Sequence, residues 1–168
     1  MNVTAKKLSG CSILTVALLL GLGTSANAGS NILSGNVCQT FYPPETSDGQ
    51  GVYHSGSGVQ NISSDGGVRL VMCPIFRDNT GNTNGMSNLT VRTTVPSGFS
   101  ASTSCIAMSL TRYGSIKVGI WKTSASTGSS GMAWGNTINK SDNGSGAYDI
   151  QCNVGYGAIL NSIEYSEP

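Results

Sequence analysis

The chain has 168 residues, a formal net charge of +1 and 23 glycines, and only 10% of its side chains are charged. Soluble domains average about a quarter charged residues, so this composition argues against a cytosolic helical protein. The hydrophobic fraction of 38% argues against disorder, since disordered chains combine low hydrophobicity with high net charge. Nucleic acid is not expected as a partner, because binding its phosphates needs a clustered excess of Lys and Arg.

Residues 1–28 have the three parts of a secretory signal peptide: the basic pair Lys6-Lys7, the apolar run 13–22, and the sequence Ala-Asn-Ala at 26–28. The apolar run is about ten residues long, against roughly 20 for a membrane-spanning helix. We therefore expect export to the periplasm or the extracellular space, with cleavage after residue 28 and no membrane anchor in the mature chain. Residues 29–168 then form the mature protein.

Apolar residues of the mature chain recur with a period of two, which is typical of half-buried strands. Leu89, Val91 and Val95 alternate with polar residues and are expected to face the core. Ile106 and Met108 are expected to face the core in the following strand by the same pattern. In chain order, the expected strands are 37–42, 59–63, 68–75, 89–95, 106–111, 116–121, 132–138, 147–154 and 159–165.

Turn-forming sequences rich in Gly, Asn and Asp separate these strands, such as Asp65-Gly66-Gly67 and Asn84-Gly85. No segment of the mature chain shows an amphipathic helix of useful length. We expect one all-β domain over 29–168, a β-sandwich or jelly roll of about eight or nine strands. The Ser/Thr/Gly-rich stretch 123–131 is interpreted as a long hairpin loop.

Four cysteines remain once Cys11 leaves with the signal peptide, and an even number in an exported chain predicts disulfides. None of the four lies in a close C-x-x-C pair, so zinc is not expected. Four cysteines allow three connectivities. We favour pairing in sequence order because it closes two moderate loops, and the other two pairings stay open. The favoured pairs are Cys38 with Cys73 and Cys105 with Cys152.

Candidate catalytic groups are few. His54 is the single histidine, and because no G-x-S-x-G nucleophile motif accompanies it, we interpret it as a solvated loop residue. Asp149 is a carboxylate within an expected strand, but its alternation with Tyr148 and Ile150 points it away from the core. We therefore expect no enzyme, no catalytic residue and no cofactor, and a polysaccharide-active enzyme is the least favoured function.

The run 78–85 is dense in Asp and Asn, whose oxygens are typical calcium ligands. It lacks the glycine and the glutamate of an EF-hand loop, because Thr83 and Leu89 stand at the sixth and twelfth positions. Turn formation explains the same residue types, so no metal site is expected here, although calcium stays an open alternative.

Trp121 and Trp134 bracket the stretch 123–131 and are the candidate ligand-binding residues. Ile116, Val118 and Ile120 are expected to face the core, and Trp121 falls on the opposite strand face, so its indole is expected to face solvent or a covering loop. Aromatic rings on a polar sheet face can stack on the apolar face of a sugar. Packing of Trp121 under the loop is the alternative interpretation, since single exposed aromatics are common.

Several short motifs of the mature chain occur together in one order. They are Asn61-Ile-Ser63, the run Val71-Met-Cys-Pro-Ile-Phe-Arg-Asp-Asn-Thr80, Val91, Cys105, Arg112-Tyr-Gly114, Cys152 and Ile163-Glu-Tyr165. This set resembles a widespread family of small, uncharacterised secreted bacterial proteins with four cysteines and a Cys-Pro-Ile/Val sequence. The resemblance implies an exported all-β domain with disulfides, and it implies no activity and no functional residue.

These observations favour a secreted, non-enzymatic β-sandwich that serves as an extracellular interaction or binding module, with a glycan or a cell-surface protein as partner. The alternative is a carbohydrate-binding module with Trp121 and Trp134 on its surface. A subunit of a bacterial surface fibre is less favoured, because the apolar spacing of the last strand breaks at Asn161-Ser162.

Overall fold

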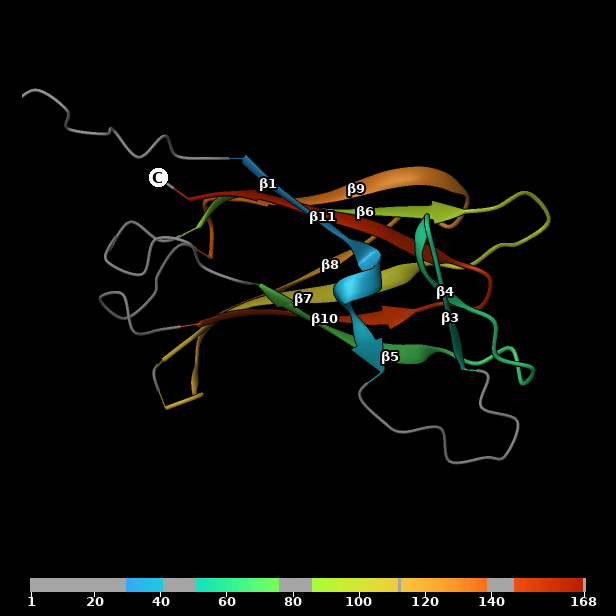
Figure 1. The fold of residues 1–168 in the computed structure, drawn as a ribbon, viewed down its shortest axis with the longest axis horizontal. Helices are drawn as coiled ribbons and strands as arrows, with labels where there is room; N and C mark the ends of the chain where they lie inside the picture. Colours follow the sequence, from blue (N-terminus) through green and yellow to red (C-terminus); the bar gives the residue numbers. More distant parts are fainter. Residues whose placement is uncertain (1–29, 41–50, 76–85, 112, 139–146, 168) are drawn as a thin grey trace, which may run out of the picture.

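The computed structural model describes residues 30–40, 51–75, 86–111, 113–138 and 147–167. This part of the chain forms eleven strands and one short 3-10 helix. The strands lie in two antiparallel sheets, stacked one above the other in Figure 1. The expected all-β sandwich is therefore confirmed. No helix in the described ranges is long and apolar enough to cross a membrane.

One sheet has six strands in the order β3-β4-β11-β6-β9, with β1 also paired to β11; in Figure 1 its strands β1, β6, β9 and β11 lie in the upper part and β3 and β4 at the right. Strand β11 is central, because it pairs with β1, β4 and β6. Its register joins Ser30 to Ser166, so the first and last strands are neighbours. The strands are β1 (Ser30–Ser34), β3 (Val52–Ser55), β4 (Gly58–Asn61), β6 (Ser87–Val95), β9 (Gly128–Gly135) and β11 (Ile159–Ser166).

The lower layer is a five-stranded sheet of order β2-β5-β10-β7-β8. Each of the nine expected strands overlaps an observed one, whereas β1 and β3 were not expected. The hairpin expected over 123–131 is wrong, because β8 and β9 belong to different sheets and the intervening residues cross between layers. The strands are β2 (Gln39–Thr40), β5 (Arg69–Ile75), β7 (Thr103–Leu110), β8 (Ile116–Thr123) and β10 (Ala147–Val154); the 3-10 helix η1 (Gly35–Val37) joins β1 to β2.

The core lies between the two sheets, and strand alternation fills it. Leu89, Val91 and Val95 of β6 are buried in it, as expected. The phase expected for β7 is wrong: Cys105 and Ala107 are fully buried in the core, and Ile106 and Met108 lie on the opposite, outer face of the sheet. The outer face of this sheet therefore carries large apolar side chains, of which Ile106 is partly exposed and Met108 is buried.

Two disulfides join Cys38 to Cys73 and Cys105 to Cys152, which is the pairing in sequence order. Cys105 and Cys152 are direct register partners of the neighbouring strands β7 and β10. All four cysteines are fully buried on the inner side of the five-stranded sheet. Disulfides are typical of proteins in an oxidising compartment, extracellular or periplasmic, and each contributes about 2–4 kcal/mol to stability.

One end of the sandwich is held by the side chain of Asn61, which is fully buried in β4. Its Nδ2 donates hydrogen bonds to the carbonyl oxygens of Gly67 and Val154, both at 2.7 Å. Its Oδ1 accepts a hydrogen bond from the backbone N–H of Ser63 at 3.0 Å. Because Val154 ends β10, this amide connects the two sheets.

At the same end, Gly157 lies between β10 and β11 with a positive φ of 79°. A Cβ at this position would overlap the ring of Phe99, which in turn contacts Tyr156 edge to face at 5.4 Å between ring centroids. Glycine is required here both for the backbone conformation and for the approach of the ring.

Candidate ligand-binding face

The outer face of the five-stranded sheet presents a row of side chains that crosses all five strands in register. The row begins on the edge strand β8 at Trp121, whose side chain is 55% exposed. Four strand spacings of about 4.8 Å give the row a length of roughly 19 Å. From β8 to β2 the row consists of Trp121, Ile106, Gln151, Met72 and Gln39, and we call it the Trp121 row.

Apolar and amide side chains are combined along this row. Ile106 and Met72 offer partly exposed apolar surface, and Gln151 between them offers an amide. Gln39 adds a second, exposed amide at the far end. The row therefore combines surface that packs against a carbon skeleton with groups that donate and accept hydrogen bonds.

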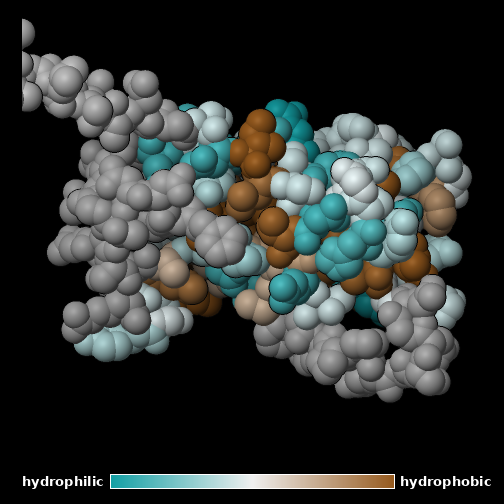
Figure 2. Space-filling view, in the orientation of Figure 1, coloured by the Kyte–Doolittle hydropathy of each residue, from teal (hydrophilic) through white to brown (hydrophobic). Residues whose placement is uncertain are grey.

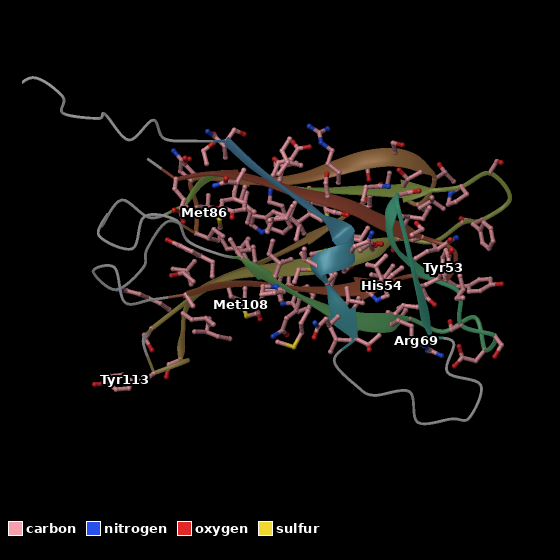
Figure 3. All side chains as sticks on the ribbon, in the orientation of Figure 1. Tyr53, His54, Arg69, Met86, Met108 and Tyr113 are labelled. Carbon is pink, nitrogen blue, oxygen red and sulfur yellow. A yellow bond between two sulfur atoms is a disulfide. The ribbon has the colours of Figure 1, made fainter. Side chains whose placement is uncertain are left out.

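The next row of the same face adds Met108 and Asp149. Met108 is only 4% exposed, and Figure 3 labels it on the lower sheet. The Nε2 of Gln151 donates to Oδ2 of Asp149 at 3.2 Å, which fixes both side chains. Partial burial raises the pKa of the Asp149 carboxyl, and the hydrogen bond from Gln151 opposes that shift. Asp149 points away from the core, as expected.

Trp121 faces outward because its neighbours on β8 face inward. Val118 and Ile120 pack against the core cluster, so the alternating positions Gly119 and Trp121 belong to the outer face. The inward position expected for Ile116 is wrong: its side chain is 60% exposed, because an irregularity in the β7–β8 register interrupts the alternation between it and Val118. A Cβ at Gly119 would lie 3.1 Å from Cδ1 of Ile106. The absence of a side chain at Gly119 therefore lets the side chains of Ile106, Ile116 and Met108 approach the backbone of β8 closely.

The expectation that Trp134 lies on the surface is wrong. Its side chain is 2% exposed, and its Nε1 donates a hydrogen bond to the backbone oxygen of Ile120 at 2.8 Å. Met132 and Trp134 share the inward face of β9, so the indole fills the core and joins β9 to β8 across the two sheets. Trp134 therefore supports the site from inside and presents no ring to a ligand.

His54 is exposed, as expected, but it belongs to strand β3 and not to a loop (Figure 3). The described ranges contain no group of three or more His, Cys, Asp or Glu side chains that could hold a metal ion. The calcium candidate at 78–85 lies outside the described residues, as does the expected signal peptide.

Comparisons with known proteins add little beyond this geometry. No family model matches the chain, and no curated protein matches it, so the resemblance to small secreted bacterial proteins stays a prediction. A solved structure described as a xylan-binding module CBM15 aligns with this chain at a TM-score of 0.48 and 12% sequence identity. The alignment covers 82% of this chain and 97% of that module. The two-sheet architecture is established by the strand pairing of this chain itself.

Four members of the Trp121 row were not predicted from the sequence. The signal that identifies them is the position of the cysteines. Since Cys73, Cys105 and Cys152 are buried on the inner face, the neighbouring residue in each strand must point outward. Counting one residue from each buried cysteine gives Met72, Ile106 and Gln151.

Proposed function

We propose that the protein is a non-enzymatic, exported module that binds a carbohydrate chain along the Trp121 row. The observation that supports this most directly is an exposed indole in register with alternating apolar and amide side chains across a sheet. Sugar rings have apolar faces that pack on aromatic and aliphatic groups, and they carry hydroxyls that bond to amides. An extended ligand lying across the strands meets both kinds of group in turn.

The sheet under the row is well suited to binding with little loss of conformational freedom. Cys105 and Cys152 join the two strands that carry Ile106 and Gln151, and Cys38, directly before β2, is joined to Cys73 of β5. A preorganised surface binds more tightly because fewer groups must be ordered when the ligand arrives. Rigidity in the five-stranded sheet therefore contributes directly to affinity.

Charge on this face favours a neutral glycan over a strongly charged one. Asp149 on β10 is partly exposed, Lys117 on β8 is exposed, and the two carry opposite charges. Neither sign predominates, so long-range attraction would not select a polyanion or a polycation. We therefore expect the ligand to be a neutral polysaccharide.

The test is binding of the purified protein to cellohexaose, xylohexaose and mannohexaose by isothermal titration calorimetry. Trp121→Ala should weaken binding at least tenfold, which corresponds to about 1.4 kcal/mol, because the indole supplies the largest apolar contact. Trp121→Phe should retain part of the affinity. Tyr113→Ala is the matched control, since Tyr113 is a highly exposed aromatic at the far end of the β7–β8 connection (Figure 3).

Unchanged affinity together with an unchanged number of bound equivalents in Trp121→Ala would refute the proposed site. Failure of all three hexasaccharides to bind the wild-type protein would favour the second candidate, a cell-surface protein partner. Apolar side chains on the same face, Met72 and Ile106 among them, also suit a protein interface.

A further inference from the structure

The outer face of the six-stranded sheet, opposite the Trp121 row, contains a hollow of about 330 Å³ between β6, β9 and β11. Every residue that lines this hollow is polar or glycine. A hollow of this kind offers hydrogen-bonding groups with little apolar surface. The lining includes Arg92, Thr94, Ser129, Ser130, Gly131 and Asn161.

Hydrogen bonds hold the lining side chains in place. Thr94 Oγ1 donates to Asn161 Oδ1 at 2.8 Å and lies 3.1 Å from Ser129 Oγ. Asn161 Nδ2 donates to the backbone oxygen of Ser57 at 3.0 Å. The hydroxyl and amide groups therefore keep fixed positions, and each hydroxyl oxygen has lone pairs for a further partner.

The single cation of the lining is already paired. Arg92 donates to both carboxylate oxygens of Glu164, from Nε at 2.7 Å and from Nη2 at 3.0 Å. The pair raises the pKa of Arg92 and lowers the pKa of Glu164, so both groups stay ionised at neutral pH. With its charge compensated, the hollow does not select an anion and is suited to a neutral molecule rich in hydroxyl groups.

A register row leads from this hollow to an exposed aromatic ring. Tyr53 is 55% exposed on the edge strand β3, and Figure 3 labels it near the end of the molecule. The row runs from Tyr53 through Gln60 and Ile159 to Thr94 at the hollow. Three strand spacings place Tyr53 about 14 Å from Thr94, within reach of one extended ligand.

We propose that this hollow is a second saccharide site, so that one molecule binds two glycan chains on opposite faces of the sandwich. The ligand class rests on the proposed function, whereas the site shares no residue with the Trp121 row. Because the two faces point in opposite directions, a molecule with both sites occupied cross-links separate chains. Multivalent attachment of this kind raises retention on a polysaccharide without new contacts at either site.

The structure supplies a matched pair of variants for this proposal. A Cβ at Gly131 would lie 3.5 Å from Thr90 Cγ2 and 3.9 Å from Arg92 Nη1, which are ordinary contacts. Gly131→Val should therefore fold and fill the hollow, since a β-branched residue suits a strand. Ala133→Val adds bulk two residues along the same face of β9, outside the lining, and serves as control. Ser129→Val is the second test variant if Gly131→Val proves unstable.

The experiment titrates wild type, Gly131→Val, Ala133→Val and Trp121→Ala with the three hexasaccharides. Wild type and Ala133→Val should bind two equivalents and precipitate a soluble polysaccharide of the same repeat. Gly131→Val and Trp121→Ala should each bind one equivalent and fail to precipitate it.

The outcomes separate the second site from the proposed function. Two equivalents and full precipitation in both Gly131→Val and Ser129→Val would overturn the second site and leave the Trp121 row intact. If wild type binds one equivalent and Trp121→Ala binds none, the second site is likewise overturned and the Trp121 row is supported. If wild type binds one equivalent, and only Gly131→Val loses it, the hollow is supported as a binding site and the Trp121 row is overturned. No binding by wild type would overturn both.

Discussion

Exchange of Asn61 for aspartate tests whether one buried amide holds the two sheets together. The change is nearly isosteric, and the retained oxygen can still accept from the backbone N–H of Ser63. The other atom changes from a donor of two hydrogen bonds to an oxygen that faces the carbonyl oxygens of Gly67 and Val154. The shape of the site is preserved while its hydrogen bonding is inverted.

The expected loss follows from counting these contacts. Two hydrogen bonds at about 1 kcal/mol each are lost, and the buried carbonyls are left without a donor at a further cost of about 1–3 kcal/mol. Asn61→Asp should therefore lower the free energy of unfolding by about 3–5 kcal/mol at pH 7. Burial of the new carboxyl raises its folded-state pKa above the unfolded value of about 3.9. The loss of stability in Asn61→Asp relative to wild type should therefore be smaller below the unfolded-state pKa of about 3.9. It should grow as pH rises through the folded-state pKa of the new carboxyl.

The assay is urea unfolding with the disulfides intact, comparing each variant with wild type at pH 7 and at pH 4. Asn153→Asp is the matched control, because it makes the same chemical change beside Val154 on the outward face of β10. The control should change stability by less than about 1 kcal/mol. A loss below about 1 kcal/mol in Asn61→Asp, or equal losses in both variants, would refute the role given to Asn61.

Two further expectations concern backbone strain and pH. Gly157→Ala should lower stability by about 2 kcal/mol or more, because it forces a side chain to a positive φ and against Phe99; a thermal midpoint equal to that of wild type would contradict this. Burial raises the folded-state pKa of Asp149 above its pKa in the unfolded chain. The contribution of this carboxyl to stability is therefore complete below the unfolded-state pKa and is lost as pH rises through the folded-state pKa. Asp149→Asn should therefore raise the urea midpoint at pH 7 and lose that advantage near pH 3, and an equal gain at both pH values would contradict the assignment.

Local alternation was sufficient to predict most strands but not every face. In β6 the alternation predicts the inward face correctly, because polar residues separate Leu89, Val91 and Val95. Strand β7 has apolar residues on both faces, because Ile106 and Met108 alternate with Cys105 and Ala107, so the same alternation predicts the wrong inward face. The disulfide at Cys105 occupies the inner face and sets the opposite phase. An apolar outer face removes the contrast that the alternation rule needs.

The remaining features depend on contacts between distant segments. Trp134 lies in the core because β9 joins a different sheet from β8, which no local pattern indicates. Strand β1 is held in the sheet by its pairing with the distant strand β11. It is short, and its Ile32 is exposed, so its own sequence does not indicate a buried face. Figure 2 shows brown apolar surface interleaved with teal polar surface on the face seen there. The hollow likewise combines three strands that are far apart in the sequence.

The place of β11 also determines when the protein can fold. Among the described strands, this eight-residue strand comes after all the others in the sequence, yet β1, β4 and β6 all pair with it. Before it emerges, the six-stranded sheet exists only as three pieces: β1 alone, the β3–β4 hairpin, and the β6–β9 pair. A nascent chain can therefore complete the six-stranded sheet only after β11 has emerged, and a variant that lacks β11 has three unpaired strand edges open to aggregation.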